Sequence, residues 1–320
     1  MAEASHAGAE LPWDGEGKQL DLQQLQTRRL VLEQLQVSVH PEAIVELVLQ
    51  AAAAVLEIYN GAAADWHVQQ KAEGKGPLTE ADLHANEIIC SGLRRLYGES
   101  IPIISEENKE IPWAKRKDFL YFWLVDPLDG TKEFIRRNGQ FTVNVGLCKK
   151  ENPIFGVVAI PTQGIVYVGG EGIGSFKLDP GMPCRKLQTK PFLLSDPGLR
   201  VVASSSHNSS NTVAFIKKLT DPRVLLFGSS IKLLMLAEAE ADLYPRYAPC
   251  CEWDTCAAHA VLRFAGGEIY QVEDTPKGFR VTRRPLVYNK ENLLNPFFVG
   301  AANTSVVDSF PHFLNADAEN

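Results

Sequence analysis

Apolar residues recur at helical spacing in two segments of the first third of the chain. Between Pro41 and Gly61, apolar side chains return every three or four residues, which predicts an amphipathic helix. Pro41 suits the first helical position, and Gly61 suits the position after the last turn. A second helix is predicted to begin at Thr79, because Asp82 follows at the spacing of a capping box.

After the second helix the pattern changes to that of strands. Two apolar runs, IPIIS at 101–105 and FLYFWLV at 119–125, predict strands. From 141 to 178, alternating segments are separated by Gly, Pro and Asn turns, which predicts an antiparallel meander. Beyond residue 196, strand-like and helix-like segments alternate, as is typical of an α/β unit.

These patterns divide the 320 residues into four predicted parts. We expect an N-terminal extension over 1–40, either a surface helix or a loose tail, and a C-terminal tail over 305–320. Between them we expect an α+β domain over 41–195 and an α/β domain over 196–304. A chain of this length usually exceeds what a single core holds.

Composition restricts the class of protein. Apolar residues make up 45% and charged residues 22% of the chain, which is ordinary for a soluble globular protein. The net charge of −7 argues against non-specific binding to nucleic acids or acidic membranes. No apolar run approaches the ~20 residues of a membrane helix, and the acidic first residues do not resemble a signal peptide. We therefore expect a cytoplasmic monomer with neither nucleic acid nor membrane as a partner.

The six cysteines are few and scattered, so reduced thiols are expected. Three of them, Cys250, Cys251 and Cys256, lie close together but form no CxxC pair. We therefore interpret them as packing residues and not as zinc ligands.

Acidic residues stand where predicted strands end and a helix begins. Glu106 follows one strand, Asp126 and Asp129 follow another, and Asp254 precedes a helix of the second half. If these carboxylates converge, they repel one another unless a cation neutralises them. Clustered carboxylates without histidine favour hard cations such as Mg²⁺. Two such ions, about 3.5–4 Å apart, can clamp a phosphoryl group.

The turn within WLVDPLDGTKEF suits this chemistry. Its two-residue insert lets Asp126 and Asp129 point to the same side and frees the carbonyl of Leu128 as a ligand. Gly130 permits close approach of the backbone, and the amides of Gly130 and Thr131 are placed to hold phosphate. The Thr131 hydroxyl is placed to orient a water molecule.

Each acidic signal also has a plainer interpretation. The Asp-x-x-Asp-Gly-Thr turn alone fits a helix cap, Glu106 with Glu107 fits a solvated strand end, and Asp254 fits an N-cap. The three signals together favour a metal site. A rival phosphatase motif, Asp-x-Asp-Gly-Thr with a nucleophilic aspartate, has a one-residue gap, whereas the gap here is two residues.

Three segments resemble the signatures of a known superfamily. SEE, WLVDPLDGTKEFI and EWDTCAAHAVL are similar to motifs of the Mg²⁺-dependent, lithium-sensitive phosphatases of the inositol monophosphatase superfamily. DPLDGTKEFIRRNGQFTVNVGL and FGSSIKLLMLAEAEADLYPRYAP resemble, within it, the 3′(2′),5′-bisphosphate nucleotidases of the bacterial CysQ type. The resemblance runs from Pro41 to Ala301. It implies a layered αβαβα sandwich of the inositol monophosphatase and fructose-1,6-bisphosphatase type.

The resemblance also implies roles for individual residues. Two or three Mg²⁺ ions would be bound by Glu106, Asp126, Asp129, Asp254 and the carbonyl of Leu128, with Glu107 beside them. Thr131, hydrogen-bonded to Asp82, would position the attacking water, and no covalent intermediate would form. The family has an aspartate where this chain has Gly74, so we expect the adjacent Glu73 to activate the water.

A second phosphate on the substrate would need fixed cations and hydroxyls. The resemblance implies that the nucleotide is bound by Ser206, His207, Ser229, Lys232 and Arg246, together with Gly130, Thr131 and Asp254. Arg246 discriminates best, because inositol monophosphatases typically have an acidic residue there. Taken singly, Lys232 also fits a solvated helix residue, Arg246 a surface ion pair and His207 a loop residue.

The expected reaction is Mg²⁺-dependent hydrolysis of the 3′-phosphate of adenosine 3′,5′-bisphosphate to give AMP and phosphate. The sulfated form, 3′-phosphoadenylyl sulfate, is a second expected substrate, and the implied role is to clear this by-product of sulfur metabolism. Two alternatives stay open. One is an inositol phosphatase of the same fold. The other is a non-catalytic sensor of nucleoside bisphosphates, which the departure at Gly74 would explain.

Overall fold

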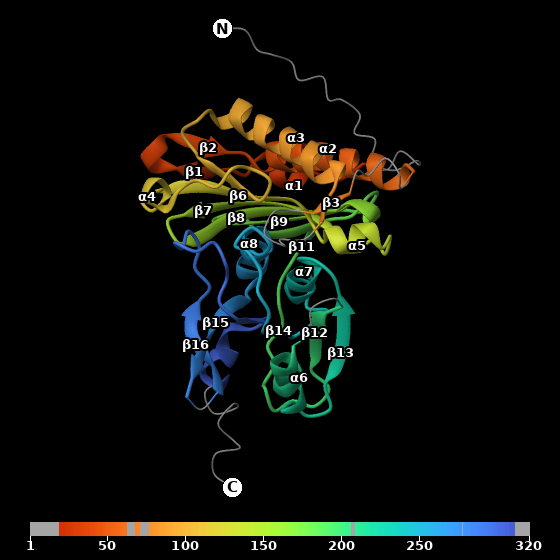
Figure 1. The fold of residues 1–320 in the computed structure, drawn as a ribbon, viewed down its shortest axis with the longest axis vertical. Coiled ribbons are helices and arrows are strands. Elements are labelled where there is room, and N and C mark those ends of the chain that lie inside the picture. Colours follow the sequence, from red (N-terminus) through yellow and green to blue (C-terminus); the bar gives the residue numbers. More distant parts are fainter. Residues whose placement is uncertain (1–18, 63–67, 71–76, 206–208, 277, 311–320) are drawn as a thin grey trace.

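The computed structural model describes residues 19–62, 68–70, 77–205, 209–276 and 278–310, and it alternates layers of helix and sheet (Figure 1). The first layer holds α2 (Pro41–Asn60) and α3 (Glu80–Tyr97), which pack against each other and on the first sheet. Both predicted helices are confirmed. Thr79 caps α3, and a capping box joins it to Asp82.

The first sheet has seven strands in the order β11-β10-β9-β8-β7-β6-β5. Its strands are β5 (Ile103–Ser105), β6 (Tyr121–Asp129), β7 (Thr142–Lys149), β8 (Asn152–Ile160), β9 (Ile165–Gly170), β10 (Gly174–Leu178) and β11 (Arg185–Lys186). Each pair of neighbours is antiparallel except β5 and β6, which are parallel. The predicted meander from β7 to β10 is therefore confirmed.

The second sheet has six strands in the order β13-β12-β14-β17-β15-β16. Its strands are β12 (Arg200–Ser204), β13 (Arg223–Phe227), β14 (Leu243–Arg246), β15 (Glu268–Thr275), β16 (Gly278–Pro285) and β17 (Phe298–Ala301). The strands β13, β12 and β14 are parallel, and the rest of the sheet is antiparallel. The expected α/β alternation thus describes only half of this sheet, and β16 and β17 were not foreseen.

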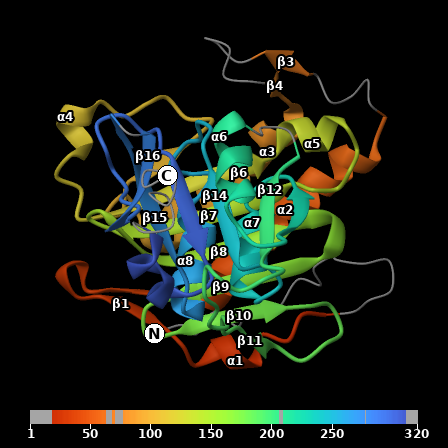
Figure 2. The same cartoon turned by 90° about the horizontal axis from the view of Figure 1, so that it is seen from below.

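Two helices lie between the sheets, α7 (Ile231–Ala237) and α8 (Cys256–Ala265), and Figure 2 shows them over the middle of the first sheet. On the second sheet, α6 (Ser210–Lys217) packs against β14. The succession of helices, sheet, helices, sheet and helix confirms the αβαβα sandwich. Short elements complete the fold: α4 (Trp113–Arg116), α5 (Thr131–Ile135), β3 (Gln69–Gln70) and β4 (Pro77–Leu78). Among the helices of the described chain, none is both long and apolar enough to cross a membrane.

The expected terminal extensions are too long at their described ends. Residues 19–40 form α1 (Gln23–Gln26) and a hairpin of β1 (Leu30–Leu32) with β2 (Val37–Val39), and their buried side chains join the core under α2. At the other end, Phe310 is fully buried in the core around the second sheet. Residues 19–40 therefore pack on the domain that they were expected to precede, and their three-residue strands leave too short an alternation to recognise. Val306 and Phe310 likewise lie in the core that the tail was expected to follow. Residues 1–18 and 311–320 lie outside the described residues.

Helix α8 approaches the first sheet closely because three glycines face it. Gly146, Gly156 and Gly169 are register partners across β7, β8 and β9, and we call this row the glycine furrow. A Cβ on Gly156 would lie 2.7 Å from the Cα of Ala257, and one on Gly169 would lie 2.5 Å from the Cα of Val261. Real Cβ atoms do not approach other atoms so closely, so only glycine fits.

Replacing Gly156 by alanine should destabilise the protein by about 3 kcal/mol, the upper end of the range for overpacking, because the new Cβ meets helix backbone that cannot move aside cheaply. The free energy of unfolding from urea titration measures this. The control is Gly61→Ala, where the nearest atom to a new Cβ is 3.3 Å away, and the change should stay within about 0.5 kcal/mol. Equal stability of the two variants would contradict the close approach.

Candidate active site

Three carboxylates from separate parts of the chain meet at one edge of the first sheet. Glu106 follows β5, Asp126 lies in β6 and Asp254 precedes α8, and one oxygen of each lies within 4.8 Å of the others. The parallel pairing of β5 with β6 brings the first two together. The glycine furrow brings the third, because it lets the start of α8 lie against the same sheet. We call Glu106, Asp126 and Asp254 the carboxylate trio.

Strand β6 continues through the predicted turn but changes register between Asp126 and Asp129. This irregularity corresponds to the two-residue insert seen in the sequence. The amide of Leu128 donates to Asp126 Oδ1 at 3.1 Å. Asp129 lies beside the trio, and its Oδ2 accepts from the amide of Ser230 at 2.5 Å. That bond ties the first half of the chain to the loop before α7.

The electrostatics of the cluster favour a bound cation. Burial, reinforced by the charges of Asp129 and Glu106, raises the pKa of Asp254 to about 8. Burial also raises the pKa of Asp129 to about 6, although the charge of Lys232 opposes the rise. A cation placed among these groups relieves both the burial cost and the repulsion. The donors are all oxygen atoms, so the trio fits a hard divalent cation.

Thr131 and Asp82 are linked as predicted. The Thr131 hydroxyl lies 3.3 Å from Asp82 Oδ1 and 3.4 Å from the carbonyl oxygen of Leu128, and it can donate its proton to either. The other oxygen of Asp82 accepts from the amide and the hydroxyl of Thr79, at 2.8 and 2.5 Å. The capping box of α3 therefore holds Asp82 in place. Among the described residues, none donates a hydrogen bond to the Thr131 hydroxyl oxygen, so its lone pairs are available there to an incoming donor.

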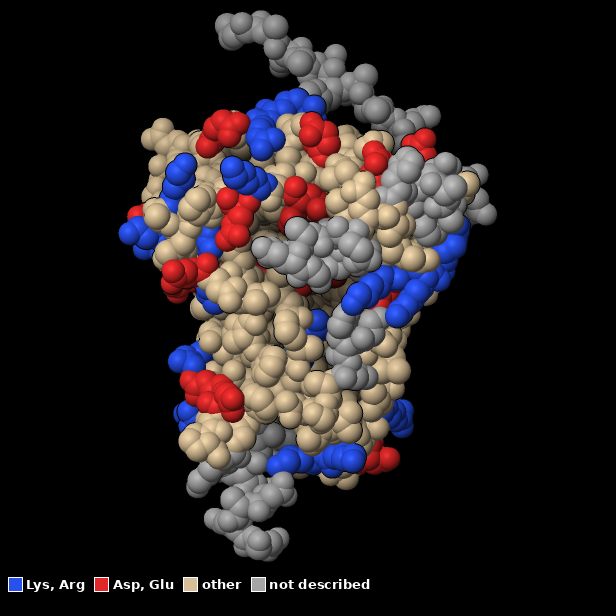
Figure 3. All heavy atoms as spheres, viewed as in Figure 1, with Lys and Arg blue, Asp and Glu red and all other residues tan. Residues whose placement is uncertain are grey.

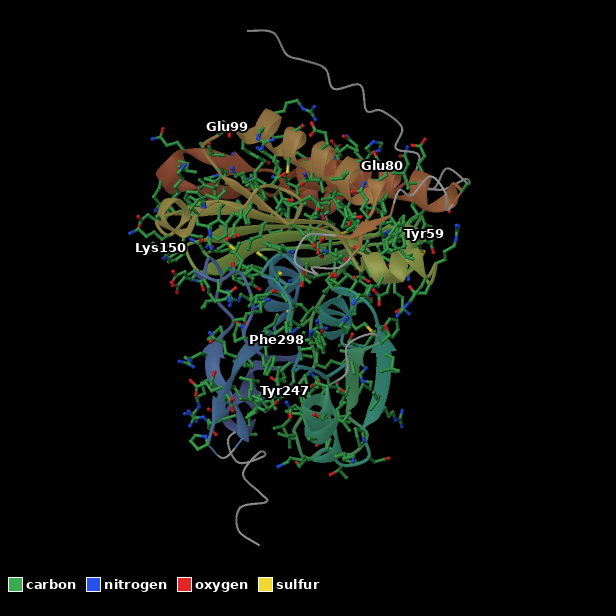
Figure 4. All side chains as sticks on the ribbon, in the orientation of Figure 1. Tyr59, Glu80, Glu99, Lys150, Tyr247 and Phe298 are labelled. Atoms are coloured by element: carbon green, nitrogen blue, oxygen red, sulfur yellow. The ribbon has the colours of Figure 1, made fainter. Side chains whose placement is uncertain are left out.

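A cleft of about 990 Å³ opens between the two halves of the chain, above the trio. Figure 3 shows a hollow at this place, with acidic and basic side chains around it. Phe298 of β17, labelled in Figure 4, lines it from the side of the second sheet. Residues of both halves thus contribute to one site.

Two cations from the second half line this cleft. Lys232 is only 3% exposed, so it is not the solvated helix residue of the plainer interpretation. Its Nζ donates to the carbonyl oxygen of Ser229 at 2.5 Å, and burial lowers its pKa to about 8. Arg246, at the end of β14, donates to the carbonyl oxygens of Ala248 and Pro249 at 3.2 and 2.9 Å.

Most of the residues predicted from the sequence gather here. The lining includes Glu106, Asp129, Gly130, Thr131, Ser229, Lys232, Arg246 and Asp254. Asp126, Leu128 and Asp82 lie directly behind it, through the trio and the contacts of Thr131 and Asp126. Four residues named in the sequence analysis, Glu73, Gly74, Ser206 and His207, lie outside the described residues.

Other lining residues were missed. Ser230 donates to Asp129, and its hydroxyl also bonds with Asn144 and Thr142, each at 2.8 Å. Its position directly after Ser229 was the available signal. Glu133 lies one helical turn beyond Asp129 and raises the pKa of that residue. The segments 108–111 and 291–294 also line the cleft, and nothing in their sequence indicated it.

Comparisons with known proteins agree on one family. The model of the inositol monophosphatase family matches residues 39–304. The 3′(2′),5′-bisphosphate nucleotidase CysQ of Escherichia coli (strain K12) is 36% identical over 258 residues, which are 80% of this chain and 97% of that protein. The CysQ of Salmonella typhimurium is 36% identical over 252 residues, 75% of this chain and 98% of that one.

Solved structures give the same picture. The structure of CysQ from Bacteroides thetaiotaomicron, described as a bacterial member of the inositol monophosphatase family, matches with a TM-score of 0.69 and 36% identity. The match covers 82% of this chain and 96% of that one. The IMPase of Thermotoga maritima matches with a TM-score of 0.64 at 18% identity, over 87% and 97% of the chains, and this likeness concerns the fold alone.

In metal-free buffer, Asp254→Asn should stabilise the protein, and more so as the pH rises. The folded-state pKa of Asp254 is about 8, against an ordinary 3.8. The folded state therefore binds more protons than the unfolded state between these values, and the wild type loses stability as the pH rises through them. The asparagine side chain of the variant does not ionise, so the variant does not lose stability in this way. The gain should reach about 2 kcal/mol or more at pH 9 and nearly vanish at pH 4.

Urea unfolding in EDTA at several pH values measures this gain. The matched control is the exposed Asp274, whose replacement by asparagine should change the free energy of unfolding by no more than about 0.5 kcal/mol. Lower stability of Asp254→Asn at every pH would contradict the electrostatic description of the site.

Proposed function

Because the chain belongs to the inositol monophosphatase family, we propose that this phosphatase hydrolyses the 3′-phosphate of adenosine 3′,5′-bisphosphate to AMP and phosphate, with Mg²⁺ as its cofactor. One observation carries the proposal: the carboxylate trio and the two cations Lys232 and Arg246 line or adjoin the same cleft. The CysQ relatives, which this chain matches over nearly their whole length, support the substrate class.

The metal would be held by oxygen atoms alone. Glu106, Asp126 and Asp254 are the proposed ligands, and Asp129 and the carbonyl of Leu128 would complete the shells of two or three ions. When bound, Mg²⁺ supplies Lewis-acid polarisation of the phosphoryl group. The chain itself supplies a cluster of buried carboxylates. Their ionised forms are unfavourable, through burial and mutual repulsion, until a divalent cation binds.

Thr131 would orient the attacking water. Its hydroxyl proton is directed to Asp82 or to the Leu128 carbonyl, so its oxygen accepts a hydrogen bond from the water and turns the water's lone pair toward the phosphorus. The threonine acts as an acceptor and not as a nucleophile, which agrees with direct transfer to water. Glu73 remains the proposed general base.

Two cations of the cleft, Lys232 and Arg246, would recognise the second phosphate. The Nζ of Lys232 donates to the carbonyl oxygen of Ser229, which also lines the cleft, at 2.5 Å. Ser206 and His207 remain proposed nucleotide ligands. An inositol ring presents hydroxyls in place of a second phosphate and would use these cations poorly. The sulfated nucleotide carries the same 3′-phosphate and should also be cleaved, consistent with a role in sulfur metabolism. That the enzyme works in the cytoplasm stays a prediction from composition, and that it is a monomer stays a separate prediction.

The first test is phosphate release with Mg²⁺ from adenosine 3′,5′-bisphosphate and from inositol 1-phosphate, each with and without lithium. We expect lithium-sensitive release from the nucleotide and much slower release from the inositol phosphate. A preference for inositol phosphate would overturn the substrate assignment. Bound nucleotide without release would instead favour the sensor.

Replacing Arg246 by methionine tests the recognition of the second phosphate. KM for adenosine 3′,5′-bisphosphate should rise about tenfold or more, because a charged hydrogen-bonding partner is lost. KM for adenosine 3′-monophosphate, which lacks the 5′-phosphate, should stay unchanged. Equal effects on both substrates would mean that Arg246 does not contact the 5′-phosphate.

Replacing Thr131 by valine removes the hydroxyl at constant size. We expect kcat to fall about 10²-fold or more with little change in KM, since the water loses its acceptor. The control is Thr162→Val, which removes the exposed hydroxyl that donates to the carbonyl oxygen of Gly139 at 2.8 Å. Unchanged kcat in Thr131→Val would exclude this role.

A further inference from the structure

A buried chain of polar side chains connects the two halves of the molecule outside the carboxylate trio. Its first member is Arg116, the last residue of α4, in the segment that joins β5 to β6. Arg116 is fully buried. Its Nη1 donates to Asn289 Oδ1 at 3.1 Å and to the carbonyl oxygen of Lys290 at 2.7 Å, and its Nη2 donates to that of Glu291 at 2.8 Å.

Asn289 forms hydrogen bonds with both Arg116 and Glu252. Its Nδ2 donates to the carbonyl oxygen of Arg116 at 2.7 Å, and its backbone amide donates to Glu252 Oε2 at 2.6 Å. Its φ of 59° lies in the left-handed region, which asparagine tolerates better than most residues. Bonds on both sides therefore hold a backbone conformation that is unfavourable by itself.

Glu252 completes the connection at the turn that precedes α8. Its carboxylate is fully buried and also accepts from the amide and the Nζ of Lys290, at 2.9 and 2.6 Å. Its backbone amide donates to Leu293, and its carbonyl accepts from Cys256, the first residue of α8, at 3.0 Å. Asp254 lies inside this turn. We call Arg116, Asn289 and Glu252 the inter-half tie.

We propose that the inter-half tie positions the metal ligands by setting the separation between Asp254 and the pair formed by Glu106 and Asp126. The tie begins in the segment between Glu106 and Asp126 and ends two residues before Asp254. The glycine furrow sets how closely α8 approaches the sheet, and the tie secures the turn ahead of it. Groups that orient metal ligands from outside the site commonly control affinity for the ion.

A purely structural role is the competing interpretation. Breaking a buried hydrogen-bonded charge destabilises a protein wherever it occurs, so lower stability alone would not distinguish the two. A positioning role predicts something more: the concentration of cation needed to occupy the site must also rise. The inference rests on the metal site of the proposed function. The experiment below distinguishes failure of the inference from failure of that metal site.

The experiment measures the Mg²⁺ concentration that half-saturates the protein, by isothermal titration calorimetry, and it measures Tm separately, because Tm keeps rising with ligand concentration and has no midpoint. Asn289→Gly removes the link to Arg116, yet glycine accepts the left-handed φ, so folding is spared. Arg116→Met breaks the tie more completely. The control, Arg200→Met, removes another multiply bonded arginine, which contacts Asp242 at 2.6 Å and the carbonyl oxygen of Ala239 at 2.7 Å. Arg200 begins β12, whose other end lines the cleft.

We expect the half-saturating Mg²⁺ concentration to rise about tenfold in Arg116→Met, the lower end for residues that support metal ligands, and by a smaller factor in Asn289→Gly. Arg200→Met should lower Tm without moving this concentration. If Arg116→Met does not fold, the Mg²⁺ concentration measured for Asn289→Gly tests the inference by itself. Wild-type half-saturating concentrations in the tie variants would overturn the inference and leave the metal site intact. No binding of Mg²⁺ by the wild type would overturn the metal site itself.

Discussion

The close contact between α8 and the first sheet is the constraint on which the site depends. Gly146, Gly156 and Gly169 leave a row without side chains, and the backbone of α8 occupies it. A row of alanines would hold the helix away by the size of a methyl group, and the carboxylate before α8 would withdraw from the other two. The carboxylate trio is therefore a consequence of backbone packing as much as of acidic residues.

The contact between α8 and the first sheet has an electrostatic cost. It buries acidic groups close to one another, and this burial and repulsion raise the pKa of Asp254 and of Asp129. The cost must be met by packing elsewhere, and two apolar cores supply it, one on each face of the first sheet. The same cleft also carries positive charge from Lys232 and Arg246, which lie close enough to Asp129 and Asp254 to oppose the rise in their pKa values. Charges of both signs within one cleft suit an anionic ligand that binds together with a cation.

The sequence predicted those elements whose formation depends on residues close together in the chain. The helix from Pro41, the capping box at Thr79 and the meander follow from spacing that a short window reveals. The metal-ligand candidates were visible because each stands at an element boundary. The antiparallel half of the second sheet was not visible, because β17 enters between β14 and β15 from a distant part of the chain.

Long-range contacts explain the other omissions. Nothing near Arg116 in the sequence indicates that it is buried against Asn289, and nothing near Glu252 indicates that its carboxylate holds that same loop. The three glycines of the furrow looked like ordinary strand glycines, since their common partner, α8, follows about a hundred residues later. Such contacts depend on topology and carry no local periodicity.

The late place of α8 in the chain matters during biosynthesis. The strands of the first sheet precede residue 187, whereas the helix that fills the furrow spans 256–265. Translation delivers the chain from its N-terminus at about 5–20 residues per second. At that rate several seconds separate the synthesis of the last strand of the sheet from that of the helix that fills the furrow. The carboxylate trio is therefore complete only after most of the chain has been made.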